Sequence, residues 1–366
     1  MTTDGNPLNI LFLEPYYGGS HRSFADGLVC NSQHTFTLET MPDRFWKWRM
    51  RGAAFHFARS VANPENFDLV LCSDMLSVTD LKALWANRCP PIILYMHENQ
   101  LSYPVPKGEQ IDYHFAFTNI SSGVAADWVL FNSETHRDAF LTKSDEFLRR
   151  LPEYRPQWMI DEIRTKCSVL YPGCDLPATD SNRDDVPLIV WNHRWEFDKD
   201  PALFFDVLKE VARRGRVFTI AVLGENFQAV PKPFIDAKDH FSDRMLQYGY
   251  VDSKVEYRRW LARGSVAVST ATQENFGISV VEAIHAGCLP LLPERLSYPE
   301  LIPEEFHELT LYKSDADLVE RLDSLLLQDR IEMPDKLKNS VDRFSWKTLI
   351  DEYDLRFSMV AERRYK

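Results

Sequence analysis

The sequence has no long hydrophobic run. Its longest apolar stretches, such as 67-FDLVLC-72 and 91-PIILYM-96, have the length of a β-strand and fall far short of the ~20 residues that a membrane span needs. The N-terminus also lacks a basic region followed by an apolar block and a small-residue cleavage site, so we expect no secretion signal. Both absences predict a cytoplasmic protein without a membrane partner.

Cysteine is scarce, and its spacing follows no metal-ligand pattern. The 366 residues contain 6 cysteines, none of them in a Cys-x-x-Cys pair, and several lie inside apolar runs. Such residues are typical of reduced core thiols in a cytoplasmic protein. We therefore expect no metal site.

Basic residues carry the minority charge. The chain has 42 Lys and Arg against 54 Asp and Glu, which gives a formal net charge of −12. An acidic total still permits a nucleic-acid partner, because phosphate responds to the local field of a basic patch. The segment 44-RFWKWRMRG-52 is such a patch, since four cations alternate there with three aromatic side chains.

Short apolar runs alternate with segments of helical period along most of the chain. Those runs are 8-LNILFLE-14, 35-TFTLETM-41, 67-FDLVLCS-73, 91-PIILYMHE-98, 127-DWVLFNS-133, 187-PLIVWNH-193, 217-VFTIAVLG-224, 265-SVAVSTA-271 and 288-CLPLLPE-294. Continuous apolar strands separated by helices predict parallel α/β sheets that are buried on both faces.

The polar stretch 178-ATDSNRDDVP-187 divides this pattern into two halves. A chain of 366 residues also exceeds the roughly 250 residues at which a single core stops growing. We predict two doubly wound, Rossmann-like domains, at 1–178 and 186–340. A helical segment at 341–366 follows them, and one arrangement returns it to the N-terminal domain.

Residues that follow the strands are the candidates for function, because ligands bind beyond the carboxyl ends of parallel strands. Gly18 and Gly19 follow the first strand, where glycines let backbone N–H groups approach a phosphate or a sugar at a helix N-terminus. His97 follows the fourth strand. A simple turn and a cap on the strand end are the alternatives for these two positions.

The second half contains a pair of cations after its first strand. Arg194 and Lys199 lie in the loop that follows 188-LIVWNH-193. Two cations at such an edge suit a diphosphate, whose charge grows as it leaves. An ordinary charged surface loop is the alternative.

A pair of glutamates follows later in the second half. The pattern of 274-ENFGISVVEA-283 predicts a helix that begins near Gly277. Glu274 then lies in the preceding loop and Glu282 on the helix. This places a carboxylate beside free N–H groups and a helix dipole, which suits hydroxyls and a diphosphate.

Together these motifs resemble the retaining GT-B glycosyltransferases of glycosyltransferase family 4. The pair of Arg194 and Lys199 with Glu-x7-Glu in ENFGISVVEA carries the resemblance, and further matches span most of the chain. They are the Gly-Gly loop, MHE at 96–98, FNSETHRDAF at 131–140, VLYPGCD at 169–175, LGENF at 223–227 and YGYV at 248–251. The resemblance implies a GT-B architecture, in which two Rossmann-like domains face each other across a cleft.

The resemblance also implies roles for individual residues. Arg194 and Lys199 bind the donor diphosphate and stabilise it as it leaves, and Glu274 and His97 complete the catalytic set beside the sugar. The implied donor-binding residues are Gly18, Gly19, Asn275, Phe276, Gly277 and Glu282, the last of which takes the ribose hydroxyls.

The implied chemistry needs no cofactor. We assign no pair of carboxyl groups at the spacing of a retaining glycosidase. The resemblance therefore points to front-face displacement, in which the departing phosphate helps to deprotonate the acceptor. This requires no metal, and it requires a cleft that closes to exclude water.

A narrower resemblance concerns the acceptor. LEPYYGGSH at 13–21, with PDRFWKWRMRGAA at 42–54, is similar to the tRNA-queuosine α-mannosyltransferases. This implies transfer of mannose from GDP-mannose to queuosine in a tRNA anticodon, with tRNA-Asp expected. On a helix over 44–61, one tryptophan lies among the cations, and indole beside guanidinium suits unstacked bases. The predicted tRNA-binding residues are Arg44, Lys47, Trp48, Arg49 and Arg51.

Two other functions stay open at this point. A GT-B enzyme with a glycan or small-molecule acceptor fits the acidic total slightly better. A non-catalytic tRNA- or nucleotide-binding module would keep the fold, although the full set of donor motifs argues against it. The segment 44–52 also fits a structural helix with a solvated charged face, and basic-aromatic runs recur at 149–158 and 256–260.

Overall fold

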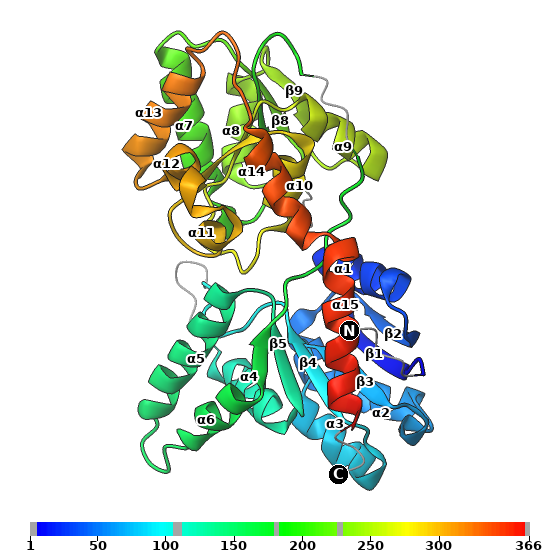
Figure 1. Cartoon of the computed structure of the whole chain (residues 1–366). Coiled ribbons are helices and arrows are strands. Elements are labelled where there is room, and N and C mark those ends of the chain that lie inside the picture. Colours follow the sequence, from blue (N-terminus) through cyan, green and yellow to red (C-terminus); the bar gives the residue numbers. More distant parts are fainter. Residues whose placement is uncertain (1–5, 105–111, 179–182, 225–229, 363–366) are drawn as a thin grey trace. The chain divides into compact units, whose positions relative to one another are not determined.

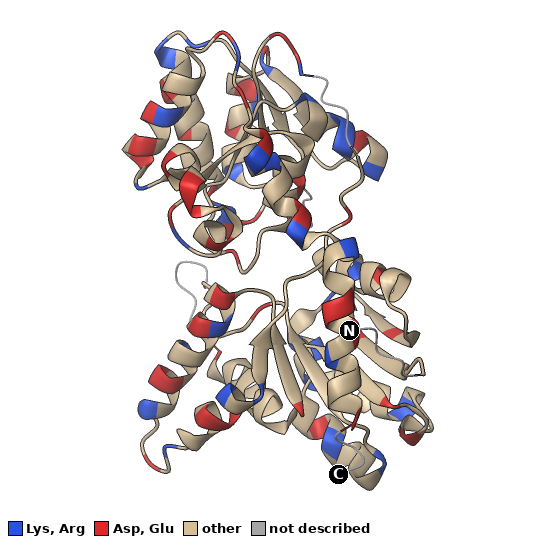
Figure 2. Cartoon of the chain, viewed as in Figure 1, with Lys and Arg blue, Asp and Glu red and all other residues tan. Residues whose placement is uncertain are grey.

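The structure, a computed structural model, describes residues 6–104, 112–178, 183–224 and 230–362 of the chain. They form two compact units (Figure 1), of which the first comprises Met1–Asp175 with Phe344–Lys366 and the second Leu176–Arg343. Each unit contains a six-stranded sheet. Figure 2 shows the central strands almost free of charged residues, which lie on helices and loops, as expected for parallel sheets covered on both faces.

The sheet of the first unit has the strand order β2-β1-β3-β4-β5-β6, and every strand pair is parallel. Its strands are β1 (Asn9–Tyr17), β2 (Thr35–Pro42), β3 (Leu69–Ser73), β4 (Ile92–Met96), β5 (Trp128–Phe131) and β6 (Cys167–Val169). Every residue of β3 and β4 is buried, which accounts for their unbroken apolar runs. The order of the strands reverses between β1 and β3.

Helices cover both faces of this sheet. They are α1 (Gly19–Asn31), α2 (Trp46–Ser60), α3 (Val78–Trp85), α4 (Tyr113–Ala125), α5 (Glu134–Arg149), α6 (Trp158–Thr165) and α15 (Trp346–Ala361). Helices α2 to α6 pack in one hydrophobic cluster with the sheet, and α1 and α15 pack in the other. The first core therefore includes a helix from the far end of the chain.

The attachment of α15 is specific. The Cys174 N–H donates to Phe344 O at 2.7 Å and the Trp346 N–H to Cys174 O at 3.2 Å, so the returning chain runs beside the segment that leaves the unit. Trp346 is only 5% exposed. A Cβ atom on Gly27 or Gly173 would overlap its indole, so these two glycines provide the space that the indole fills.

The sheet of the second unit has the order β12-β11-β10-β7-β8-β9. Its strands are β7 (Leu188–Trp191), β8 (Thr219–Val222), β9 (Met245–Tyr248), β10 (Val266–Val268), β11 (Leu289–Pro293) and β12 (Leu311–Tyr312). Their pairing is parallel throughout. This is the order of the dinucleotide-binding Rossmann fold, and its reversal falls between β7 and β10.

The helices of the second unit begin with a short 3-10 turn at Phe197–Lys199. The α-helices are α7 (Pro201–Arg213), α8 (Lys232–His240), α9 (Lys254–Arg263), α10 (Ile278–Ala286), α11 (Tyr298–Leu301), α12 (His307–Thr310), α13 (Asp315–Leu325) and α14 (Asp335–Ser340). The nine apolar runs of the sequence all contain strands, so the predicted α/β class with two parallel sheets is confirmed.

The state of the thiols agrees with the expectation from composition. All six cysteines are free, and Cys72, Cys174 and Cys288 are buried as core residues, whereas Cys30 is exposed. Among the described residues, no helix combines the length and the hydrophobicity that crossing a membrane requires.

Replacing Trp346 with alanine should destabilise the first unit. The indole packs on Phe24 and Tyr353, at ring-centroid distances of 5.8 and 5.6 Å, and its loss from a core costs about 3–5 kcal/mol. Thermal unfolding measures this loss. The control is Trp158→Ala, at a tryptophan that is 61% exposed, which should change stability by less than about 0.5 kcal/mol. Equal losses in the two variants would contradict the packing of α15.

Candidate active site

In the second unit, the predicted donor-site residues gather where the strand order reverses. Arg194 and Lys199 follow β7, and Glu274 follows β10, which is paired with β7 in the sheet. The loops after these two strands are also bonded to each other. The Thr272 N–H donates to Asp198 O at 2.7 Å, and Thr270 Oγ1 donates to Lys199 O at 2.8 Å.

Lys199 connects the two loops through its side chain. Its Nζ donates to Gln273 O at 2.6 Å, and it lies 3.4 Å from Glu274 Oε2 and 3.2 Å from Asp198 Oδ2. The side chain is 8% exposed. Burial alone would lower the pKa of Lys199, but the carboxylates of Glu274 and Asp198 outweigh it and raise the pKa. Lys199 is therefore a buried ammonium that stays charged.

Asp198 is a site residue that the sequence reasoning missed. Its exposed fraction is 0%, and within the described residues neither of its carboxylate oxygens has a hydrogen-bond partner apart from the ion pair with Lys199. Such a carboxylate is tolerated in a core only beside a cation. The sequence did contain a signal for Asp198, since it is an acidic residue directly before a lysine that was predicted to bind diphosphate.

Arg194 differs from Lys199 in exposure. Its side chain is 47% exposed, and its guanidinium lies 3.3 Å from Glu196 Oε2. Of the two predicted cations, Lys199 is therefore fixed and buried, whereas Arg194 is open to solvent.

The turn before α10 has the predicted form. Gly277 has a φ of +109° and precedes the helix, which begins at Ile278, so the predicted start near Gly277 is confirmed. Phe276 is 3% exposed, and its carbonyl accepts a hydrogen bond from Ser297 Oγ at 2.7 Å. The side chain of Asn275 accepts one from Gln273 at 2.9 Å. Glu274 therefore stands on a turn held by side-chain hydrogen bonds.

Glu282 lies on α10 and belongs to a network that the sequence did not reveal. The Tyr257 hydroxyl donates to Glu282 Oε2 at 2.9 Å and accepts from Asn192 Nδ2 at 3.0 Å. Asn192 also donates to Ser279 O at 2.7 Å. Burial, followed by the nearby Glu282 carboxylate, raises the pKa of Tyr257 well above its ordinary value, so the phenol stays a donor.

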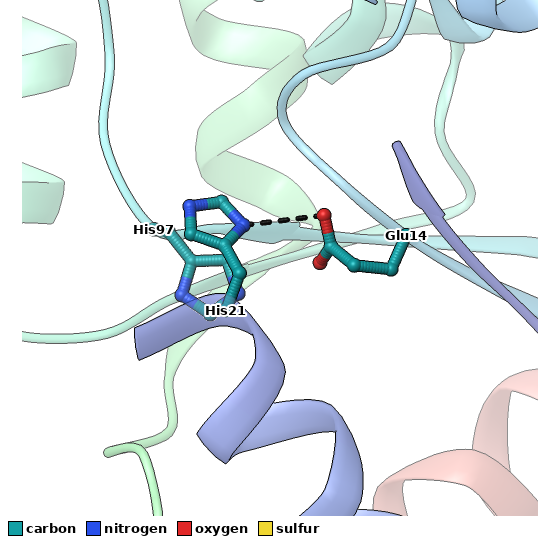
Figure 3. Close-up of side chains that lie close together, drawn as sticks. All are labelled: Glu14, His21 and His97. Carbon is teal, nitrogen blue, oxygen red and sulfur yellow. Dashed lines mark hydrogen bonds and ion pairs between the residues drawn. The ribbon is translucent and has the colours of Figure 1, made fainter. Parts of the chain in front are cut away.

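In the first unit, His97 is brought together with Glu14 and His21 (Figure 3). Glu14, in the second half of β1, has 0% exposure. Its Oε1 accepts hydrogen bonds from the Tyr16 N–H and Ser73 Oγ, both at 2.9 Å, and lies 3.2 Å from His21 Nδ1. His21 lies in the first turn of α1. Sequence reasoning missed both residues, although GGSH at 18–21 placed a histidine directly after the glycine loop.

The ring of His97 is enclosed by other rings. Its centroid lies 4.1 Å from that of His21, 4.9 Å from Phe24 and 4.8 Å from Tyr95. Burial, and then the charge of His21, lowers the pKa of His97 well below its ordinary value. The imidazole of His97 is therefore neutral at physiological pH.

The backbone of His97 is fixed as well. Its N–H donates to Asp74 Oδ1 at 2.9 Å, and its carbonyl accepts from Asn132 Nδ2 at 2.8 Å. Asn132 Oδ1 in turn lies 2.7 Å from His136 Nδ1. The FNSETHRDAF motif thus fixes the loop that carries His97.

His21 has the opposite charge state from His97. Burial alone would lower the pKa of His21, but the Glu14 carboxylate raises it to about 9. The ligand atoms of Glu14, His21 and His97 lie within 4.8 Å of one another, close enough to hold a metal ion. Without a metal, Glu14 and His21 form an ion pair beside the neutral imidazole of His97.

The two glycines of the loop before α1 differ in their surroundings. Gly19 has a φ of +49°, with open space where a side chain would begin, whereas a Cβ atom on Gly18 would overlap the carboxylate of Asp43. Gly18 is therefore required by the close approach of Asp43. A carboxylate lies against the loop that was predicted to bind donor phosphate, and that role stays a prediction.

The basic segment 44–52 lies at the start of α2, and one of its predicted tRNA-binding residues is buried. The helix begins at Trp46 after Phe45, whose φ is +57°. With this starting residue, the helix turns the Arg49 side chain inward, and Arg49 is 7% exposed. Its Nε and Nη2 donate to Pro42 O at 3.3 and 3.1 Å. Arg49 therefore caps the end of β2, and its role in tRNA binding stays a prediction.

The other predicted residues of this segment are accessible. Trp48 is 65% exposed, and within the described residues Arg44, Lys47 and Arg51 are exposed and form no ion pair. Each of these cations lies over an aromatic ring, at 5.4 to 5.8 Å from its centroid. Arg149 of the run at 149–158, in contrast, is paired with Asp145.

Comparison with known proteins agrees with this geometry. Residues 9–174 match the family model described as tRNA-queuosine alpha-mannosyltransferase N-terminal, and residues 178–343 match glycosyl transferases group 1. A tRNA-queuosine alpha-mannosyltransferase of Drosophila melanogaster is 32% identical over 364 residues, which cover 94% of this chain and 95% of that protein.

Solved structures with the same fold are glycosyltransferases and related enzymes of low sequence identity. The sucrose-phosphate synthase of Thermosynechococcus elongatus has a TM-score of 0.73 at 12% identity, covering 96% of this chain and 99% of its own. HepE of Anabaena, solved with UDP and glucose, has a TM-score of 0.69 at 14% identity, covering 96% and 100%. The protein is thus a GT-B glycosyltransferase, as predicted. Within that class, the chain belongs to the tRNA-queuosine alpha-mannosyltransferase family.

The His21–Glu14 pair should make stability depend on pH. Because the pKa of His21 is about 9 in the folded protein and ~6.5 when unfolded, its stabilising contribution is complete below pH ~6.5 and is lost as pH rises to about 9. Between pH 7.5 and 9.5, the gap in melting temperature between wild type and His21→Gln should therefore narrow.

Burial raises the pKa of Asp74 to about 7, below that of His21, so the change in the upper part of this pH range reports mainly on His21. A gap that stays constant across this range would show that His21 is not charged in the folded protein.

Proposed function

We propose that this protein is a retaining glycosyltransferase that moves mannose from GDP-mannose to queuosine in the anticodon of a tRNA, in the cytoplasm. The observation that carries the proposal is the identity of 32% to the Drosophila enzyme over 94% of the chain. The alignment spans both units, so it covers the donor-site residues and the basic segment of α2 together.

The donor is held by the second unit in this proposal. Arg194 and Lys199 bind the diphosphate, Glu274 with the turn at 275–277 binds the sugar hydroxyls, and Glu282 binds the ribose. Lys199 supports this assignment because it is charged and fixed before any ligand arrives. A preorganised cation stabilises developing charge without the cost of reorienting at the moment of reaction.

The transfer proceeds by front-face displacement. The departing phosphate takes the proton of the acceptor hydroxyl, while Arg194 and Lys199 stabilise the charge that the phosphate gains. His97 lies beside the sugar as a neutral imidazole, which can exchange a hydrogen bond with a sugar hydroxyl without adding charge. Gly18 and Gly19 form the loop that faces the donor, although the Gly18 N–H already donates to Tyr16 O at 2.9 Å, and no metal or other cofactor takes part.

The tRNA binds to the first unit through α2. The support is that Arg44, Lys47 and Arg51 have no carboxylate partner within the described residues, so phosphate does not have to displace one. Trp48 presents an exposed indole among them, on which an unstacked base can lie.

The direct test is transfer to tRNA. Purified protein is incubated with GDP-mannose and queuosine-containing tRNA, and digested nucleosides are examined by mass spectrometry for a hexose increment on queuosine. UDP-sugars and tRNA lacking queuosine are the controls. We expect transfer only with GDP-mannose and queuosine, and at the same rate in EDTA. Transfer to a glycan in place of tRNA would support the alternative acceptor class.

Arg194→Ala should lower turnover on the order of 10²-fold, as the loss of one preorganised charge contact does. Because its side chain is 47% exposed, the melting temperature should hardly change. Lys232→Ala, at a lysine 82% exposed in the same unit, is the matched control and should retain full turnover. Normal turnover in Arg194→Ala would remove Arg194 from the diphosphate site.

Lys199→Ala should lower both turnover and stability, because it leaves the buried Asp198 carboxylate without its cation at a cost of about 3–5 kcal/mol. The double variant Lys199→Ala with Asp198→Asn separates the two effects. It should recover most of the lost stability while turnover stays low. Recovery of turnover in the double variant would contradict a role of Lys199 in the reaction.

Trp48→Ala with Arg51→Ala should raise the KM for tRNA and leave GDP-mannose binding unchanged. Each lost phosphate contact should flatten the log–log salt dependence of tRNA binding by roughly 0.7 to 0.9, and a lost base stack costs about 1–3 kcal/mol. Arg213→Ala, an exposed arginine of the other unit, is the control. A lower melting temperature with equal losses for tRNA and donor would indicate a structural helix.

A further inference from the structure

Glu14 and His21 have no assigned role in the donor chemistry described above. The side chain of His21 is 9% exposed. Its Nδ1 faces Glu14, and the other ring nitrogen points away from it (Figure 3). Within the described residues, Nε2 has no hydrogen-bond partner. Because the pKa of His21 is about 9, Nε2 carries a proton at neutral pH, and the ring presents a charged donor without an acceptor.

Glu14 determines which way this donor points. Its Oε1 is fixed by the Tyr16 N–H and by Ser73 Oγ, each at 2.9 Å, before it meets His21 Nδ1 at 3.2 Å. The imidazole therefore has one orientation, in which Nδ1 is satisfied by the protein and Nε2 is left for a ligand. A charged imidazolium N–H is a strong donor, so a ligand oxygen that reaches Nε2 gains a charge-assisted hydrogen bond.

The charges around His21 limit the kind of ligand. The titratable groups nearby are Glu14 of β1, Asp43 against Gly18, Asp74 after β3, and His97 and Glu98 after β4. Carboxylates outnumber the single cation of His21, so a diphosphate would meet net repulsion. A molecule without phosphate that is rich in hydroxyl and carbonyl oxygens fits better, because it can accept from His21 and donate to carboxylates.

Tyr16 links His21 to the proposed tRNA-binding helix. The Tyr16 ring lies 5.8 Å from that of His21, edge to face. Tyr16 also packs on the hydrophobic cluster that includes Met50, and Trp46 packs on the same cluster. Met50 and Trp46 both belong to α2. The proposed tRNA-binding surface on α2 and the His21 side chain therefore lie on one connected part of the first unit.

We propose that His21 donates a hydrogen bond from Nε2 to an oxygen of the acceptor nucleoside, and that Glu14 is the positioning residue that aims it. The bond goes to an oxygen that does not react, because a cationic donor would make an attacking hydroxyl a weaker nucleophile. His21 thus orients the acceptor beside His97. This inference rests on the function proposed above.

The test compares wild type, Glu14→Gln and His21→Gln in mannose transfer to queuosine-containing tRNA from pH 6 to 10, with saturating GDP-mannose. Wild-type kcat/KM for tRNA should fall as pH rises through about 9, the pKa of His21. In Glu14→Gln the same fall should begin below neutral pH, because burial then favours the uncharged ring. At pH 7, kcat/KM should drop roughly 10- to 100-fold, as for a lost hydrogen bond to a charged group.

His21→Gln keeps a donor of similar reach without a charge. It should retain part of the activity and lose the fall near pH 9, an outcome that a purely structural role would not produce. His240→Gln, at an exposed histidine of α8, is the control and should follow the wild-type profile. GDP-mannose affinity should be the same in all four proteins.

The outcomes separate this inference from the proposed function. A wild-type protein that transfers no mannose would overturn both. An active wild type whose pH profile is shared by Glu14→Gln and His21→Gln would overturn only the assignment of His21. Equal losses of GDP-mannose affinity and tRNA turnover in Glu14→Gln and His21→Gln would also overturn the assignment of His21.

Discussion

Parallel pairing is the constraint on which the rest of the structure depends. It directs the carboxyl ends of all strands of a sheet to one edge, and it requires helices to cross on opposite faces wherever the strand order reverses. The loops after β7 and β10, and those after β1 and β3, diverge at these reversals. Lys199 with Glu274, and His21 with Glu14, lie at those points, so both polar clusters follow from the strand order.

The sequence was a good guide wherever a feature is local. Long apolar runs between helices identified the central strands, whereas β6, β9 and β12 were not predicted because they are short or only partly buried. Arg194, Lys199 and Glu274 could be found because each follows a strand closely. Asp198 and Tyr257 could not, because their roles arise from burial and from contacts across the fold.

The basic segment shows why composition alone was insufficient. Alternating cations and aromatic residues fit several helix phases, and the phase is set by Phe45, whose left-handed backbone starts α2 at Trp46. As a result, Arg49 donates hydrogen bonds to Pro42 O at the end of β2, while Trp48 stays exposed. A non-glycine residue with positive φ is uncommon, and the sequence carried no sign of it.

The return of α15 to the first unit affects how the chain emerges from the ribosome. The first six strands are synthesised early, but the face of their sheet that Trp346 and Tyr353 cover stays bare until the second unit has been translated. The second unit is therefore an insertion within the first in terms of core formation. The growing chain must carry an unfinished hydrophobic surface while the whole second unit is synthesised. During this period the surface is exposed to chaperones and to misassembly.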